Sequence, residues 1–329
     1  MGQHPTVLEA MHEALDRAGA GAGGICEVSR SIHCHAILEN ELADLHGKEK
    51  ALLFASGDLA NQAAIATLAD QISDCIVFGD AANHDSLIQG IWQSGAEFQI
   101  FRHNDPDDLA NRLVGVDPWR PKLVCFQSIN PMDGRIAPVA EICGVAERYG
   151  AMTYLDEDHA VRVFGPTGGG IAERDGAIHR LTAIHGTLGT SFGVVGGYIA
   201  GSAKLIDFLR CCAPSLMLTT SFPPAVVAGA LASVRHLRSS SIERDRHQQR
   251  VATVKRRLLE AGLPMMPSES HIIVLPVRGA QRSQAVSDEL LLRFGSRSMI
   301  RRSRVGVSAC ASPRHRSILM NISIIWSPR

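Results

Sequence analysis

The chain has 329 residues, of which 45% are hydrophobic, and its 33 basic side chains balance 33 acidic ones. This length suits one large domain and a smaller one. The balanced charge and an aromatic content of only 5% argue against a nucleic-acid partner or a membrane surface as partner.

The sequence shows no sign of a membrane-spanning helix, a signal peptide or a cysteine-based metal site. No apolar run approaches the ~18–20 residues of a membrane-spanning helix. The N-terminus lacks the basic and apolar regions of a signal peptide, so a cytoplasmic location is expected. The eight cysteines form no C-x-x-C pair, which predicts buried, reduced thiols and no metal site.

Two amphipathic helices are expected first. One begins at Pro5 and carries apolar residues at Val7, Leu8, Met11 and Leu15, and the other covers 36–46. Seven short apolar runs with β-branched or aromatic residues then alternate with helical patterns. These runs are 51–56, 75–80, 98–103, 122–128, 151–157, 181–187 and 194–201. The alternation predicts an α/β fold with a mostly parallel sheet covered by helices on both faces.

The pattern changes near residue 236. A polar helix over 241–262, a strand over 271–277 and a helix over 284–294 predict a smaller α/β domain. We therefore expect an N-terminal segment (1–35), a large domain (36–235) and a small C-terminal domain (236–329).

The last part of that small domain, 296–329, is rich in arginine and serine and lacks periodicity before ILMNISIIW (318–326). It is either a variant tail or the product of a shifted reading frame. In both cases we expect poor packing.

Three polar motifs follow predicted strands. Asp156 begins the run DEDH at the end of the strand 151–157. A carboxylate there could hold a pyridine nitrogen protonated, although Asp156 or Asp158 would equally suit a helix N-cap. His84 follows the strand 75–80 and could stack on a flat ring or simply be a loop histidine. The glycine-rich turn GTLGTSFG (186–193) could admit a phosphate.

In order and spacing, these motifs resemble the α-oxoamine synthases, a branch of the fold-type-I pyridoxal-phosphate transferases, and within it the 5-aminolevulinate synthases. The resemblance runs from Met1 to about Gly295. It includes ELADLHGKE (41–49), NHDSLIQGI (83–91), EICGVAERYGAMTYLDEDHAV (141–161) and GTLGTSFGVVGGYIAGS (186–202). It implies a mostly parallel seven-stranded sheet with a smaller C-terminal α/β domain.

The resemblance also implies a cofactor, pyridoxal 5′-phosphate (PLP), and a role for each matching residue. Asp156 would pair with the pyridine nitrogen, His84 would stack on the ring, and His159 would lie near the ring hydroxyl. The phosphate would contact Thr187 and the backbone of Ser56, Gly57 and Asp58. Thr219 and Thr220 would reach the phosphate of the partner subunit's cofactor, so a homodimer is implied.

The implied reaction condenses glycine with succinyl-CoA to 5-aminolevulinate, CoA and carbon dioxide, the first step of tetrapyrrole (heme) biosynthesis. Another α-oxoamine synthase and a non-catalytic relative are the alternatives that the sequence leaves open.

Three departures from the family pattern bear on activity. Thr190 stands where the family has the lysine that tethers the cofactor and moves the substrate proton, so bound PLP is expected to be non-covalent. Arg162 stands where the family has glycine after H-A-V, and Glu27 stands where the family presents polar neutral groups. The sequence therefore predicts a site of this family with low synthase activity.

Overall fold

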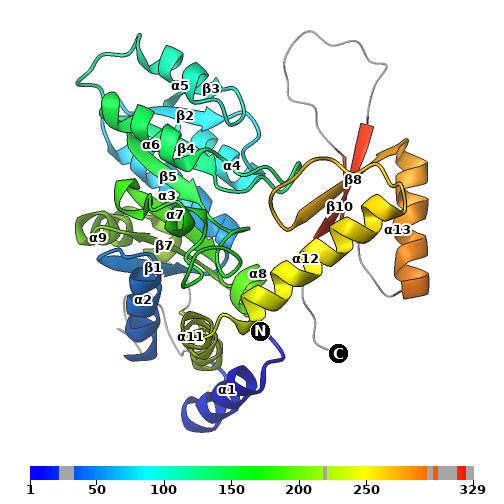
Figure 1. Cartoon of the computed structure of the whole chain (residues 1–329). Helices are drawn as coiled ribbons and strands as arrows, with labels where there is room; N and C mark the ends of the chain where they lie inside the picture. Colours follow the sequence, from blue (N-terminus) through cyan, green and yellow to red (C-terminus); the bar gives the residue numbers. More distant parts are fainter. Residues whose placement is uncertain (22–32, 218–220, 295–298, 303–316, 324–329) are drawn as a thin grey trace. The chain divides into compact units, whose positions relative to one another are not determined.

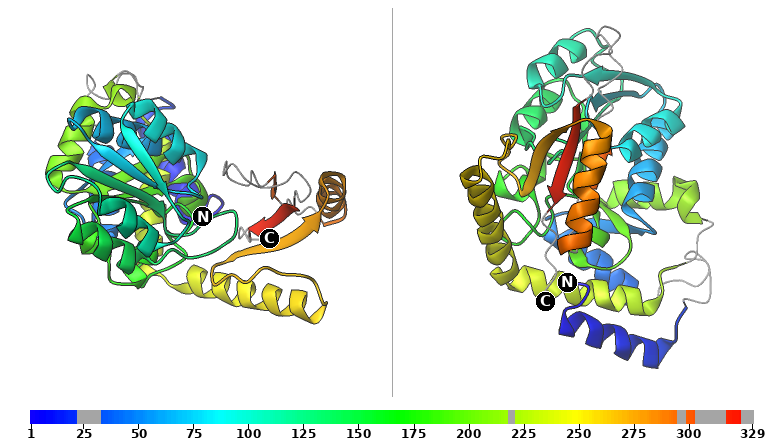
Figure 2. Two further views of the ribbon diagram at one scale, coloured as in Figure 1. Left: turned by 90° about the horizontal axis from the view of Figure 1, so that it is seen from above. Right: turned by 90° about the vertical axis from the view of Figure 1, so that its right-hand side faces the viewer.

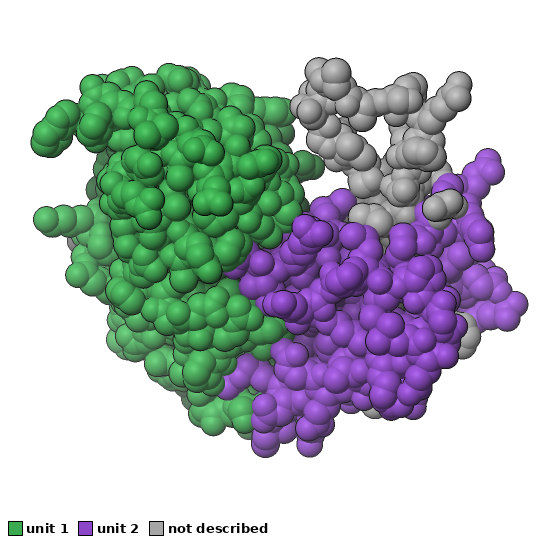
Figure 3. Space-filling model, turned by 45° about the horizontal axis from the view of Figure 1, so that its top comes forward, with its two compact units in different colours: residues 1–128, 138–241 green, residues 129–137, 242–329 purple. Residues whose placement is uncertain are grey.

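The computed structural model describes residues 1–21, 33–217, 221–294, 299–302 and 317–323 (Figure 1). Glu27, Thr219 and Thr220 lie outside these ranges, as does most of the chain after Phe294. Two units are distinguished, one formed by Met1–Ser128 and Pro138–Ser241, the other by Ile129–Ala137 and Ile242–Arg329 (Figure 3).

The first unit is built on one seven-stranded sheet in the order β1-β7-β6-β5-β4-β2-β3. β7 pairs antiparallel with β1 and β6, and the pairs among β2 to β6 are parallel. The strands are β1 (Lys50–Phe54), β2 (Ile76–Asp80), β3 (Glu97–Phe101), β4 (Lys122–Gln127), β5 (Met152–Asp156), β6 (Ala183–Thr187) and β7 (Gly197–Gly201). Each coincides with one of the predicted apolar runs, so the mostly parallel seven-stranded sheet is confirmed.

Apart from the edge strand β3, which is mostly exposed, the sheet is buried on both faces because its side chains alternate between two apolar cores. Leu52 and Phe54 of β1 belong to the core on the face that α3 and α9 cover. Ala51 and Leu53 of the same strand belong to the core on the opposite face, beneath α1, α2 and α11. Both helical layers flank the sheet in Figures 1 and 2. This two-sided burial explains why the strands are nearly continuous apolar runs.

The helices of this unit are α1 (Pro5–Ala18), α2 (His33–Leu45), α3 (Gly57–Gln71), α4 (Asp85–Ser94), α5 (Pro106–Leu113), α6 (Val139–Arg148), α7 (Ile171–Arg174), α8 (Gly189–Phe192), α9 (Ala203–Cys212), α10 (Pro214–Met217) and α11 (Pro224–Ser239), with a short 3-10 helix at Ile178–Arg180. The two expected amphipathic helices are α1 and α2. No helix in the described part of the chain is both long and apolar enough to cross a membrane.

The second unit contains a three-stranded antiparallel sheet in the order β8-β10-β9. Its elements are α12 (Ile242–Glu260), β8 (Ile272–Arg278), α13 (Ala280–Phe294), β9 (Met299–Arg302) and β10 (Ser317–Ser323). β10 matches the ILMNISIIW run. A strand also forms before that run, at Met299–Arg302, where pairing with β10 supplies order that periodicity does not reveal. The poor packing expected of 296–329 stays a prediction.

The segment Ile129–Ala137 belongs to this second unit although it directly follows β4. The carbonyl oxygen of Gly134 accepts hydrogen bonds from Ser268 Oγ (2.9 Å) and Ser270 Oγ (2.7 Å). Gly134 has φ of 73°, and a Cβ there would lie 2.6 Å from Ser268 Oγ, so only glycine fits.

Candidate active site

Asp156 is the last residue of β5 and lies near the centre of the sheet, with 3% of its surface exposed. Its Oδ1 is 2.7 Å from His185 Nδ1 and accepts a 2.9 Å hydrogen bond from the Asp158 backbone N–H. Its Oδ2 accepts a 3.2 Å hydrogen bond from Asn61 Nδ2. No helix occurs within 157–170, so the alternative that Asp156 caps a helix is wrong.

The charges of Asp156 and His185 stabilise each other. Burial raises the pKa of Asp156, but the charge of His185 and its hydrogen bond outweigh this and lower the pKa from 3.8 to about 2. Burial lowers the pKa of His185, but the Asp156 carboxylate outweighs it and raises that pKa above its usual value. These opposite shifts favour a carboxylate on Asp156 and an imidazolium on His185 inside the sheet.

His84 precedes α4 as its N-cap residue. Its Nδ1 is 2.9 Å from Ser86 Oγ, and its backbone N–H donates to Gln127 Oε1 over 2.8 Å. Ser86 Oγ also accepts from Asn61 Nδ2 (3.0 Å), and this amide reaches Asp156 Oδ2. His84 and Asp156 are thus joined through two buried side chains, which fixes both at the same edge of the sheet.

The turn after β1 carries three of the residues expected at the phosphate. Ser56 caps α3 by accepting the Leu59 N–H over 3.1 Å, and Gly57 begins the helix. A Cβ on Gly57 would lie 3.2 Å from Thr187 Oγ1 and 3.4 Å from His185 Nε2. Asp58 follows in the first turn and is exposed. The turn 56–58, Thr187 and the Asp156–His185 pair therefore lie together.

Position 190 lies in the short helix α8 and is exposed. Thr190 Oγ1 donates a 2.8 Å hydrogen bond to Asp158 Oδ1. The neighbouring His159 is half-buried, and its charge also lowers the pKa of Asp156. The expected residues Asp156, His159 and Thr190 thus belong to one cluster.

The five lysines of the chain lie on other elements or turns. Lys48 Nζ donates to the carbonyl oxygens of Ile178 and Leu181, and Lys50 pairs with Asp207. Lys122 Nζ donates to the carbonyl oxygens of Pro118 and Arg120. Lys204 is exposed on α9, and Lys255 belongs to the second unit, where its Nζ donates to Ser268 O and Ser270 O.

Three residues of this site were not predicted from the sequence: Asn61, Gln127 and His185. The available signal for Gln127 was a polar residue at the end of an apolar strand, and for His185 it was a histidine inside one. Asn61 lies inside the helix α3, where Tyr154 O–H donates to its Oδ1 over 2.8 Å and orients the amide toward Asp156. Nothing in the helical pattern of α3 indicates this contact.

The residues fit the ring and phosphate of PLP, apart from the covalent tether. A buried, ionised carboxylate at the end of β5 suits a protonated pyridine nitrogen. A Cβ on Gly197 would lie 2.5 Å from Gly57 Cα, so a glycine is needed where β7 passes the turn 56–58.

Comparisons with known proteins agree with this geometry. The sequence profile of the class I and II aminotransferases matches residues 1–319. The 5-aminolevulinate synthase of Rhizobium meliloti is 54% identical over 295 residues, covering 90% of this chain and 73% of the relative. A solved Sphingomonas wittichii serine palmitoyltransferase superposes with a TM-score of 0.90 at 30% identity, covering 98% of this chain and 79% of that one.

A second solved structure, of SPT with PLP internal aldimine, has a TM-score of 0.89 at 30% identity, with the same coverage of both chains. The matched profile, the identity to a synthase over most of both sequences and the shared sheet all identify one group. The chain belongs to the class I and II aminotransferases and, within them, to the 5-aminolevulinate synthase family.

Proposed function

We propose that this chain is a 5-aminolevulinate synthase-type protein that binds PLP without a covalent link and condenses glycine with succinyl-CoA only weakly. The observation that supports the first half is the buried, ionised Asp156 at the end of β5, joined to His84 through Asn61 and Ser86. The second half rests on Thr190, which stands where the family resemblance implies the tethering lysine.

Each residue has a defined task in this proposal. When bound, PLP supplies an electron sink for charge that develops on the substrate. Asp156 holds the ring nitrogen, His84 stacks on the ring and His159 faces the ring hydroxyl. Thr187 and the turn 56–58 bind the phosphate. Thr190 Oγ1, a neutral hydroxyl that donates to Asp158, cannot remove a substrate proton at neutral pH.

We further propose a cytoplasmic homodimer in which Thr219 and Thr220 reach the partner subunit's cofactor. This part rests on the family resemblance, because both residues lie outside the described ranges. The domain limits at 35 and 235 likewise remain a prediction.

The test uses the purified full chain with added PLP. Visible absorbance should show saturable binding that Asp156→Asn abolishes, and borohydride should fix no cofactor to any peptide. Aminolevulinate formation from glycine and succinyl-CoA should be about 10²–10⁴ lower than in the Rhizobium meliloti enzyme. Cofactor fixed to a peptide containing Lys122 or Lys204, or turnover equal to that enzyme, would contradict the proposal.

A further inference from the structure

His185 and Asp156 face each other across two neighbouring parallel strands. In the register of β5 and β6 they are paired residues, and their side chains meet at 2.7 Å between Nδ1 and Oδ1. His185 is 1% exposed and Asp156 is 3% exposed. The contact is therefore built into the sheet and is shielded from solvent.

The two carboxylate oxygens of Asp156 differ in the strength of the hydrogen bonds that they accept. Oδ1 accepts from His185 Nδ1 and from the Asp158 N–H at 2.9 Å, which accounts for both of its lone pairs. Oδ2 accepts from Asn61 at 3.2 Å and lies 3.5 Å from Gln127 Nε2, the outer limit of a hydrogen bond. Oδ2 is thus the oxygen that can accept one more strong donor.

We propose that His185 is a positioning residue that engages Oδ1 of Asp156, so that Oδ2 is presented to the cofactor's ring nitrogen. This inference rests on the proposed function, because it needs a ring nitrogen in the site. His185 itself does not touch the ring in this arrangement. It acts by fixing the plane of the carboxylate and by keeping that carboxylate ionised.

The charges around His185 favour this role. Asp156 on β5 and Asp158 just after it both raise the pKa of His185, and the Gly57 peptide adds to this. Burial opposes this and is the largest single cause acting on the pKa of His185, but the carboxylates outweigh it. The nearby His46 adds no charge, because burial lowers its pKa to about 3. The two carboxylates therefore favour the protonated form of His185.

Two variants separate charge from hydrogen bonding. His185→Asn keeps a donor near the position of Nδ1 but removes the charge, whereas His185→Leu removes both. PLP affinity should fall about tenfold in His185→Leu and less in His185→Asn, as expected for loss of a charge-assisted hydrogen bond. In both variants the loss of PLP binding on acidification should move to higher pH, because Asp156 then protonates more readily.

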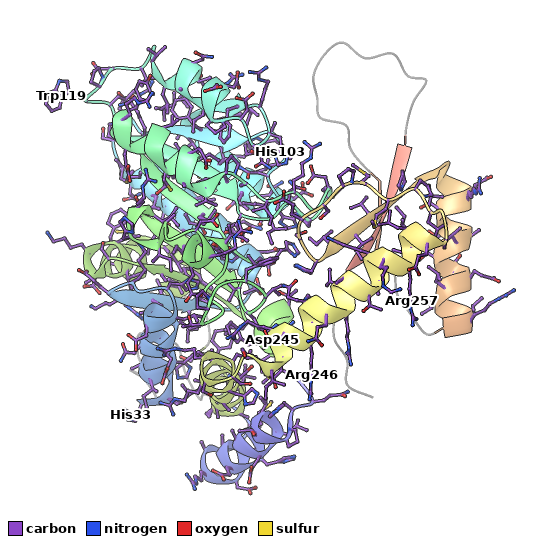
Figure 4. All side chains as sticks on the ribbon, in the orientation of Figure 1. His33, His103, Trp119, Asp245, Arg246 and Arg257 are labelled. Atoms are coloured by element: carbon purple, nitrogen blue, oxygen red, sulfur yellow. The ribbon has the colours of Figure 1, made fainter. Side chains whose placement is uncertain are left out.

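A matched control exists in the same sheet. His103, labelled in Figure 4, lies in the turn after β3 and pairs its Nδ1 at 2.7 Å with Oδ1 of Asp80, the last residue of β2, in the same kind of contact. His103→Asn and His103→Leu should leave PLP affinity and its pH profile unchanged. If they shift binding as much as the His185 variants do, the effect is general loss of stability and the inference fails.

A second measurement needs neither a variant nor the cofactor. Nitrogen NMR of imidazole-labelled full chain should show His185 doubly protonated at pH 7 and titrating above the ordinary histidine range. A singly protonated His185 would overturn the inference while leaving the proposed function standing. A protonated His185 in a chain that never binds PLP would instead refute the proposed function, and with it the positioning role.

Discussion

Thr190 Oγ1 donates a hydrogen bond to Asp158 Oδ1 over 2.8 Å, so a carboxylate lies directly beside residue 190, where the family resemblance implies a lysine. Asp158 does not cap a helix, because no helix begins between it and α7. An amine placed at residue 190 would therefore lie close to the negative charge of Asp158.

The Asp158 carboxylate should control how a lysine at position 190 captures PLP. Thr190→Lys should allow covalent capture of PLP, seen as a visible absorbance band and as cofactor fixed by borohydride. The Asp158 carboxylate should hold the new ammonium in its charged form and raise its pKa, so capture should increase with pH. Adding Asp158→Asn should lower the pH of half-capture by about one unit.

Thr190→Met is the control for this series, because it has a long side chain without an amine and should show no band. If the pH of half-capture is the same in Thr190→Lys with and without Asp158→Asn, the carboxylate does not act on the lysine. Aminolevulinate formation should stay well below that of the Rhizobium meliloti enzyme in both variants.

Arg162 adopts a left-handed backbone conformation with φ of 74°, and its N–H donates to the carbonyl oxygen of Gly168 over 2.7 Å. Such a conformation is unfavourable for a residue with a Cβ and is accessible to glycine. Arg162→Gly should therefore raise the free energy of unfolding by about 1 kcal/mol, measured by denaturant titration. Arg162→Ala removes the same side chain but keeps the Cβ, so a gain of equal size there would contradict a backbone origin.

Glu157 is fully buried, and its carboxylate accepts backbone hydrogen bonds from Ile171 (3.1 Å) and Ala172 (2.7 Å). Burial raises the pKa of Glu157 from 4.5 to about 7. The folded chain therefore binds a proton more tightly than the unfolded chain between these values. Stability should fall as the pH rises through this window, by an amount of the order of 3 kcal/mol.

Glu157→Gln mimics the protonated acid and should remove this part of the pH dependence. Denaturant unfolding at pH 5 and at pH 8, compared between the two proteins, isolates it from the titration of His185. The same slope of stability against pH in both proteins would show that Glu157 does not titrate in this range.

Gly186 of β6 lies against the ring of Tyr198 on β7, and Tyr198 O–H lies 2.9 Å from His46 Nε2. A Cβ on Gly186 would approach the Tyr198 hydroxyl oxygen to 2.3 Å. Gly186→Ala should lower the melting temperature, with a cost of about 1–3 kcal/mol from overpacking. Gly115→Ala is the control, since a Cβ there meets nothing within 4 Å, and an equal loss in that variant would contradict the steric explanation.

The sequence by itself determined the local features of this protein. Seven apolar runs predicted the seven strands, because side chains buried on both faces of a parallel sheet leave a continuous apolar pattern. The position of Asp156 at a strand end followed from the same pattern, and the absence of a lysine at position 190 is a plain fact of the chain.

Only the tertiary structure decided which polar groups meet. His185 reaches Asp156 because β5 and β6 are paired in that register. Asn61 reaches the same carboxylate from α3, although it lies 95 residues before Asp156 in the chain. The segment 129–137 joins the second unit because Gly134 is bound by two serines more than 130 residues away. Contacts between residues so distant in the chain depend on strand order and register, which no local periodicity encodes.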